Sequence, residues 1–329
     1  MSKVVLRTLL LAALAFLPSA SWAVTNAVVG GCVSGTQFPT IQSAVDAASN
    51  ASTVKVCPGT YSEQVTINKS LTLNGLALGR SAVIVPPAGG FVLNGSSGSN
   101  LFAAQVLVQN ATVTINNIGV DANSVGQSCL PVGRWVGIAY QSASGTIKNL
   151  AIRNGPTCGD STAILGENTK NLKITNNSIH DCADCIDLTE AVSTTISSNA
   201  IIQGEVAYLG VNLKDSPGPT TISGNTISKI ETGIYAINSG NVSVTSNIIT
   251  TNPFAIGIQL VGASNHAVQN NRVSNAYQAI AIDDTGATGT NFVTQNTIND
   301  SVCGISVGPN SIDTVSPNTF YVVGGWYCP

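Results

Sequence analysis

The sequence predicts an all-β fold in which a coil of about two dozen residues is stacked many times, a right-handed parallel β-helix. The main observation is a short motif, a small residue followed by Ile or Val, that recurs from residue 137 onward. Its aliphatic residues lie at positions 138, 164, 186, 211, 234, 258, 280 and 305, so the period is 22 to 26 residues. Periods of this length are typical of stacked repeats.

A second motif recurs in phase with the first and begins with an asparagine. Its asparagines are Asn177, Asn199, Asn225, Asn247, Asn271 and Asn296. Short alternating segments lie between the two motifs, so each coil is expected to hold three short strands. Coils stack about 4.8 Å apart, which places isoleucine on isoleucine inside and asparagine on asparagine at a turn. We therefore expect a structural role for these asparagines, with each side-chain amide bonding to the next coil.

Residues 1–23 are typical of a secretory signal peptide. Lys3 and Arg7 precede an apolar run over residues 9–17 that is too short to span a bilayer, and a small-residue cleavage site ends at Ala23. The remaining chain, residues 24–329, is expected to be one β-helix domain in a secreted protein, extracellular or periplasmic, without a membrane span.

Both ends of a β-helix need protection, because unpaired strand edges promote aggregation. Residues 40–49 are expected to form a capping helix at the N-terminal end, with Thr40 as N-cap and Ile41, Ala44, Val45 and Ala48 on one face. Regular coils are expected over residues 137–310, and residues 311–329 are expected to close the C-terminal end.

All eight cysteines lie after the signal peptide, and an even number in an exported chain indicates disulfides. Eight cysteines allow 105 pairings. Proximity in the sequence favours Cys32–Cys57, Cys129–Cys158, Cys182–Cys185 and Cys303–Cys328. A metal site at Cys182, Cys185 and His180 is the alternative, but a second ligand pair at zinc-site spacing is missing.

The segments around the predicted cap resemble the opening of pectinesterases and of the wider pectin lyase-like β-helix superfamily. The resemblance lies in residues 38–48 (FPTIQSAVDAA), 54–67 (VKVCPGTYSEQVTI) and 71–75 (LTLNG). It implies the fold, while activity depends on the site residues.

The catalytic motifs of this superfamily are absent from the sequence. The Leu78-Gly79-Arg80 stretch is similar to a pectinesterase arginine motif, but it comes too early and lacks the following Pro-Trp. Residues 181–187 and 281–284 faintly resemble the Asp-Asp-Cys stretch of polygalacturonases, whose Gly-His-Gly and Arg-Ile-Lys motifs are missing. Arg153 and Arg272 lack the acidic partners that a calcium-dependent pectate lyase needs.

In a β-helix, outward residues of successive coils form columns to which a polymer can bind. One such column is formed by the residue that directly follows the aliphatic residue of the first motif. It is expected to contain the substrate-binding residues Asn212, Tyr235 and Gln259. The densest charge lies nearby, and we expect any catalytic residues to be Asp184, Asp187 and Lys214. A carboxylate pair suits glycosidic cleavage, and calcium is a possible cofactor only for a lyase. A solvated acidic turn is the alternative interpretation.

The charge balance excludes some partners. After residue 23 there are 11 basic and 16 acidic residues, which argues against a nucleic-acid partner. We expect a monomer that binds or acts on an extracellular polysaccharide or cell-surface glycan. Two alternatives remain open: a polysaccharide lyase, glycoside hydrolase or epimerase that uses Asp187, and a purely structural surface protein.

Overall fold

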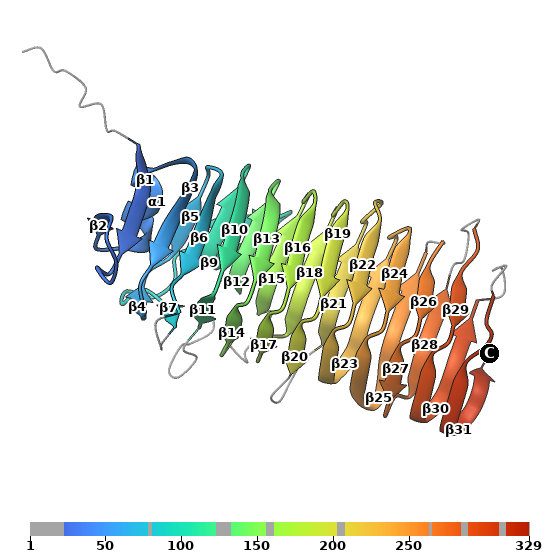
Figure 1. Cartoon of the computed structure of the whole chain (residues 1–329). Helices are drawn as coiled ribbons and strands as arrows, with labels where there is room; N and C mark the ends of the chain where they lie inside the picture. Colours follow the sequence, from blue (N-terminus) through green and yellow to red (C-terminus); the bar gives the residue numbers. More distant parts are fainter. Residues whose placement is uncertain are drawn as a thin grey trace, which may run out of the picture.

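The computed structural model of the chain describes residues 23–77, 81–122, 133–155, 161–202, 208–262, 265–283, 289–308 and 314–328, with side chains to residue 325. Its strands stack side by side along one long axis, from the N-terminal residues to the C-terminus (Figure 1). The predicted β-helix is confirmed, and a typical coil such as β16, β17 and β18 contains three short strands. Within the described residues, no helix is long and apolar enough to cross a membrane.

One wall of the stack is a 12-stranded sheet of parallel strands. Its strands, in spatial order, are β2 (Thr36–Phe38), β1 (Val24–Val29), β3 (Ala48–Val56), β6 (Leu71–Gly75), β10 (Thr112–Asn116), β13 (Ser144–Lys148), β16 (Leu172–Thr175), β19 (Thr194–Ser197), β22 (Thr220–Ser223), β24 (Val242–Thr245), β26 (Ala267–Gln269) and β29 (Phe292–Thr294).

The other walls belong to a 19-stranded sheet, which the pairing divides into two rows. The first row contains β4 (Gly59–Ser62), β7 (Ala82–Val85), β11 (Ile118–Asp121), β14 (Ala151–Arg153), β17 (Ser178–His180), β20 (Ala200–Ile202) and β27 (Arg272–Ser274). The second row contains β5 (Val65–Ile67), β9 (Asn100–Gln109), β12 (Arg134–Gln141), β15 (Thr162–Glu167), β18 (Asp184–Thr189), β21 (Leu209–Lys214) and β28 (Gln278–Asp283).

Four long strands belong to both rows, because they continue through the corner of the coil without a break. They are β23 (Thr226–Ile237), β25 (Ile248–Val261), β30 (Thr297–Val307) and β31 (Thr319–Cys328). The last of them extends the stack by parallel pairing with β30. β8 (Gly95–Ser97) is different, since it pairs antiparallel with the start of β9.

The core is a continuous file of aliphatic side chains between the walls. The anchors expected from the repeat are in register: Ile138 pairs with Ile164, Ile164 with Ile186, and Ile186 with Val211, all fully buried. Equivalent residues of neighbouring coils therefore pack on one another along the whole stack.

The asparagines form the expected ladder. From Asn199 to Asn296, each side-chain oxygen accepts the backbone N–H and the side-chain Nδ2 of the preceding coil's asparagine at 2.9–3.0 Å. The oxygen of Asn177, the first rung, accepts the Leu150 N–H at 3.0 Å. Asn318 adds a rung that the sequence motif did not include. For the six rungs from Asn177 to Asn296, the left-handed backbone conformation is adopted by the residue before the rung, such as Asn176 and Ser198 with φ 56°, and not by the rung itself.

The capping helix α1 spans Ile41–Ala47, with Thr40 as N-cap in a capping box with Ser43. It is shorter than expected because Ala48 begins β3. Ile41, Ala44 and Val45 are buried, as expected. The Glu63 carboxylate accepts the backbone N–H groups of Ile41 (2.8 Å) and Gln42 (2.9 Å), where a negative charge complements the helix dipole.

Two of the expected disulfides are present in the described residues, Cys32–Cys57 and Cys182–Cys185. The second bond removes both thiols from the alternative metal site, and His180 instead hydrogen bonds Ser178 at 2.8 Å. Cys303 is disulfide-bonded, and the side chain of its expected partner Cys328 lies outside the described residues. Residues 1–22 of the expected signal peptide, Cys129, Cys158, Arg80 and Asp284 also lie outside them.

Candidate functional site

The second row presents an outward column of the kind that the repeat predicts. Each coil contributes one residue to this column, and each residue is in register with the next in the order Ala139, Leu165, Asp187, Asn212, Tyr235, Gln259, Ala281 and Ser306. The three expected substrate-binding residues, Asn212, Tyr235 and Gln259, are consecutive in it and half-buried. A second column lies two residues further along each strand: Gln109, Gln141, Glu167, Thr189, Lys214, Ile237, Val261 and Asp283.

The N-terminal part of the first column is covered by protein. Leu107, Ala139 and Leu165 are at most 1% exposed and pack with Phe102, Ala104 and Val136 in an apolar cluster separate from the core. This outer cluster lies on the solvent side of the second row.

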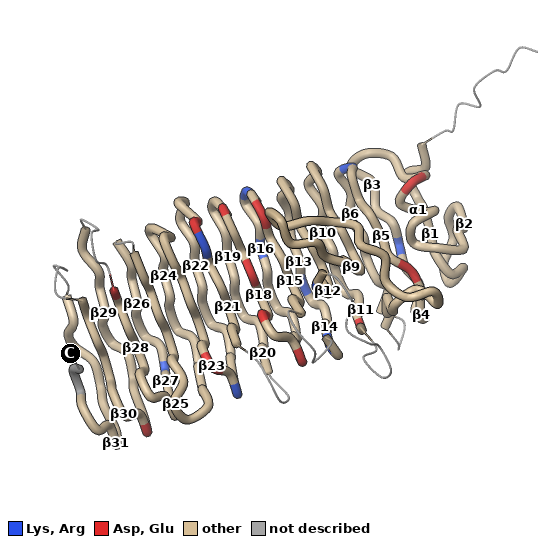
Figure 2. Tube along the Cα trace, turned by 180° about the vertical axis from the view of Figure 1, so that it is seen from behind, with Lys and Arg blue, Asp and Glu red and all other residues tan. Residues whose placement is uncertain are grey.

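Residues 86–100, which we call the arm, extend across this part of the surface. Figure 2 shows the chain between β7 and β9 crossing neighbouring coils. Gln141 Nε2 donates to the Ser96 carbonyl at 2.7 Å. In the middle of the arm, the Gln64 side chain bonds to both the N–H and the carbonyl of Val92 (2.8 and 3.0 Å). Glutamine side chains of the coils therefore hold the arm at its middle and next to its tip.

A groove of about 620 Å³ lies between the tip of the arm and the ends of the second-row strands. The tip contributes residues 97–100, and the second column contributes the strand residues Gln141, Glu167, Thr189 and Lys214. The turns after the strands contribute Ser142, Asn168, Glu190 and Asp215. The lining thus consists of hydroxyl, amide, carboxylate and ammonium groups, with a glycine at the tip.

Hydrogen bonds fix several of these side chains. Gln141 Nε2 donates to Glu167 Oε2 at 2.6 Å and Gln109 Nε2 donates to Gln141 Oε1 at 3.1 Å, so adjacent coils are linked along the column. Asn238 Nδ2 donates to Asp215 Oδ1 at 3.0 Å. These contacts orient polar groups toward a ligand before it arrives, which lowers the entropy lost on binding.

Asp187 does not line this groove. It is 8% exposed, and its carboxylate accepts Arg134 Nη1 at 3.2 Å and Asn212 Nδ2 at 3.0 Å. Arg134 belongs to β12, two coils earlier, so its side chain crosses the intervening coil, roughly 10 Å of stack. Arg134 was not among the expected site residues, and a sequence separation of 53 conceals its pairing with Asp187.

The three expected catalytic residues are in three different settings. Asp184 pairs with Thr162 and Leu209 at the start of β18 and is half-buried. Lys214 is exposed, lies in register with Thr189, and is the member of the three that lines the groove. The cation that binds Asp187 is thus Arg134 rather than Lys214. His266 is 1% exposed, and its Nδ1 accepts the Val242 N–H at 3.4 Å.

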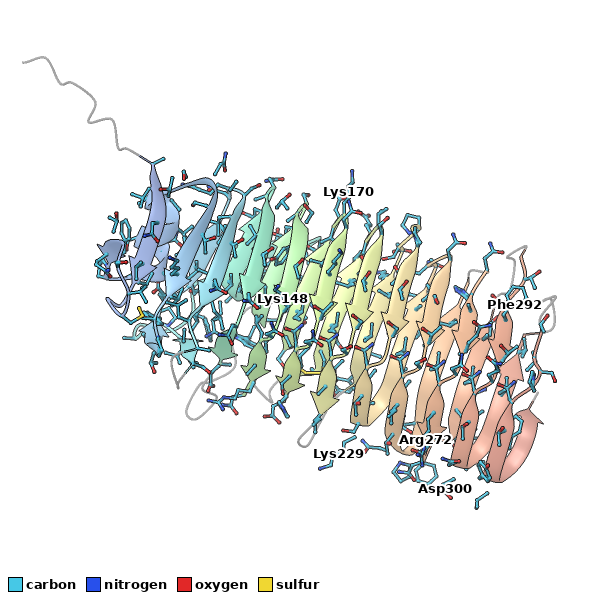
Figure 3. The ribbon with its side chains drawn as sticks, viewed as in Figure 1. Lys148, Lys170, Lys229, Arg272, Phe292 and Asp300 are labelled. Carbon is cyan, nitrogen blue, oxygen red and sulfur yellow. A yellow bond between two sulfur atoms is a disulfide. The ribbon has the colours of Figure 1, made fainter. Side chains whose placement is uncertain are left out.

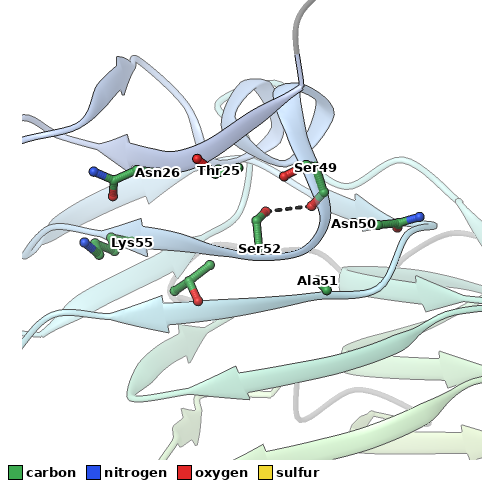
Figure 4. Close-up of a pocket in the computed structure, with 8 residues that line it drawn as sticks. Thr25, Asn26, Ser49, Asn50, Ala51, Ser52 and Lys55 are labelled. Atoms are coloured by element: carbon green, nitrogen blue, oxygen red, sulfur yellow. Dashed lines mark hydrogen bonds between the residues drawn. The ribbon is translucent and has the colours of Figure 1, made fainter.

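Two further hollows lie on other walls. One of about 460 Å³ lies beside β1 and β3, where Ser52 donates to the Ser49 carbonyl at 2.6 Å and Lys55 is the charged lining residue (Figure 4). The other, about 160 Å³ on the first row, contains the ion pair between Arg153 and Asp121 at 2.8 Å. The expectation that Arg153 lacks an acidic partner is therefore wrong, because Asp121 lies one coil earlier and 32 residues away in the sequence. Neither hollow includes a residue of the two outward columns.

Comparison with known proteins agrees with this architecture. A family model described as the right handed beta helix region matches residues 162–320. The search of curated protein sequences finds no match to the chain. The chain is a right-handed parallel β-helix protein.

Solved structures are similar over most of the chain. DFA-IIIase from Arthrobacter chlorophenolicus A6 without its lid is 16% identical with a TM-score of 0.57, over 90% of this chain and 98% of that one. The A-module of mannuronan C-5 epimerase AlgE6 from Azotobacter vinelandii is 16% identical with a TM-score of 0.53, over 88% and 94%. A tailspike protein of E. coli bacteriophage HK620 is 16% identical with a TM-score of 0.63, over 88% of this chain and 59% of that one. At these identities the similarity defines the fold alone.

Proposed function

We propose that this protein is exported and binds an extracellular polysaccharide along the outer face of its second row. The observation that carries the proposal is the groove, where polar side chains repeat once per coil opposite a fixed wall, the tip of the arm. A ligand that repeats along its length fits a surface that also repeats along its length. Asn212, Tyr235 and Gln259 extend this surface toward the C-terminus and supply two amides and an aromatic ring.

Two further observations support the proposal. One structural neighbour is named as an epimerase of mannuronan, so a similar fold acts on a polysaccharide. The Cys32–Cys57 and Cys182–Cys185 disulfides suit an oxidising compartment, as the sequence of residues 1–23 does.

The test is binding of the purified protein to a panel of neutral and acidic polysaccharides by affinity electrophoresis, with Thr189→Trp as the diagnostic variant. Thr189 lies between Glu167 and Lys214 on the groove floor, so an indole there fills the space of a ligand. We expect at least tenfold weaker binding. Thr221→Trp is the matched control, because Thr221 is exposed on the 12-stranded sheet. Equal binding by both variants, or binding of no polysaccharide, would contradict the proposal and favour a structural role.

A glycoside hydrolase is the second candidate function, because Glu167, Glu190 and Asp215 all line the groove. Glycosidases use two carboxyl groups on either side of the scissile bond. Release of reducing ends from a bound polysaccharide, abolished in Glu167→Gln, would support it. The sequence-based hypothesis that Asp187 is catalytic predicts a different result. Turnover should then be lost in Asp187→Asn, although the groove carboxylates are intact in this variant. Binding without turnover would exclude both versions.

A further inference from the structure

The charges of the protein are unevenly distributed over its walls. Among the described residues, the second row contains one arginine, Arg134, and one lysine, Lys214. The other cations of the described residues lie elsewhere. Lys55, Lys148, Lys170 and Lys173 are at the 12-stranded sheet, Arg153 and Arg272 are on the first row, Lys229 is at the corner of β23, and Lys69 lies between β5 and β6 (Figure 3 labels Lys148, Lys170, Lys229 and Arg272). Because Arg134 is held by Asp187 with 15% of its side chain exposed, Lys214 is the cation that the second row offers to a ligand.

Carboxylates outnumber this cation around the groove. Glu167, Glu190 and Asp215 line it together with Lys214. Both turn carboxylates, Glu190 and Asp215, are exposed. The four charges lie on three successive coils, which span about 10 Å of the stack. This span is close to the Debye length of about 10 Å at 0.1 M salt, so the charges act on a bound ligand together.

Beyond Lys214 the two columns are uncharged over two coils, those of β23 and β25. The outward residues of β23 and β25 in the two columns are Tyr235, Ile237, Gln259 and Val261. In β28, Ala281 follows in the first column, and the next charge along the second column is the carboxylate of Asp283. A ligand that follows these columns therefore meets amides, a phenol and aliphatic groups, and then another negative charge.

We propose that the groove selects uncharged polysaccharides and discriminates against polyuronates. This inference rests on the proposed function and narrows its ligand class. A polyuronate carries a carboxylate on each sugar, so it would bring several negative charges beside three carboxylates and one ammonium group. A neutral polysaccharide instead supplies hydroxyl donors, and hydrogen bonds from a neutral donor to an ionised acceptor are stronger than those between neutral groups.

The test uses polysaccharide pairs with the same backbone and different charge. Suitable pairs are polygalacturonate with its methyl ester, mannuronan with its carboxyl-reduced form, and a neutral glucan with its carboxymethyl derivative. In EDTA at 50 mM salt we expect the uncharged member of every bound pair to bind at least tenfold more tightly. At 500 mM salt the ratio should fall at least threefold, because salt screens the repulsion.

The double variant Glu190→Gln/Asp215→Asn should also lower this ratio at least threefold at 50 mM salt. Asp46→Asn/Asp300→Asn removes two exposed carboxylates from the cap helix and from β30 and should leave it unchanged (Figure 3 labels Asp300). Equal or tighter binding of the charged members, with or without added calcium, would overturn the inference and leave the proposed function intact. Failure to bind any pair would contradict the proposed function itself.

Discussion

Replacement of Asn225 by alanine removes an interior rung of the asparagine ladder. Its Oδ1 accepts the N–H and Nδ2 of Asn199 (2.9 Å each), and its Nδ2 donates to the Ile196 carbonyl (3.0 Å) and to Asn247 Oδ1 (2.9 Å). The side chain is fully buried, so no solvent replaces these bonds.

The magnitude follows from what remains after truncation. Asn199 Nδ2 keeps the Ile174 carbonyl, and Asn247 Oδ1 keeps the Asn225 N–H, whereas the Asn199 N–H loses the acceptor it has in the ladder. An orphaned buried donor costs about 2 kcal/mol, and each of the other three lost bonds about 0.7 kcal/mol. We therefore expect Asn225→Ala to lower the free energy of unfolding by roughly 4 kcal/mol.

The assay is urea unfolding followed by far-UV circular dichroism, with hydrogen exchange at the Asn199 amide to detect local opening. Asn252→Ala is the control, because Asn252 is exposed in β25; its change should stay within about 0.5 kcal/mol. A loss below about 1 kcal/mol in Asn225→Ala, with an unchanged denaturant slope and a protected Asn199 amide, would refute the reasoning.

Three other outcomes are expected. Removal of the Cys32–Cys57 disulfide, whose cysteines are 25 residues apart, should lower the free energy of unfolding in urea by about 3 kcal/mol. Removal of Cys182–Cys185, whose cysteines are three residues apart, should lower it by less than half as much, because a shorter loop restricts the unfolded chain less. Asp187→Ala should lower the free energy of unfolding by about 2 kcal/mol because it leaves Arg134 unpaired. The double variant Asp187→Leu/Arg134→Met should recover part of the loss. An Asp187→Ala variant as stable as the wild type would contradict the stabilising role of the ion pair. Burial raises the pKa of Tyr140, so the folded state keeps a proton that the unfolded state releases above about pH 10. The free energy of unfolding should therefore fall as the pH rises above this value, and it should fall less steeply in Tyr140→Phe. This variant also loses the hydrogen bond from the Tyr140 hydroxyl to the Val113 carbonyl.

The regular part of the fold is predictable because each coil repeats the same local pattern. The alternation around Ile186 and the asparagines of the ladder are visible in one period, and parallel stacking leaves little freedom in the register. The column Asp187–Asn212–Tyr235–Gln259 could therefore be read from the sequence before its neighbours were known.

The groove could not be predicted in this way, because it depends on a segment that interrupts the period. The arm contains Gly89, Gly90 and Gly98, a signal of an irregular insertion, but nothing in that signal gives its direction. Arg134 was missed for a related reason. A contact across two coils depends on the length and rotamer of one side chain, whereas the repeat specifies only neighbours one coil apart.

The arm also constrains the order in which the molecule can assemble. Residues 97–100 precede Glu167, Thr189 and Lys214 in the chain, yet they face them across the groove. Coils can stack one after another as they become available, but the tip of the arm reaches its place only after the coils of β15, β18 and β21 exist beneath it. Contacts so distant in sequence form slowly because a long loop must close first. During refolding the stack should therefore form before the groove, and an intermediate with complete coils should still lack the ligand site.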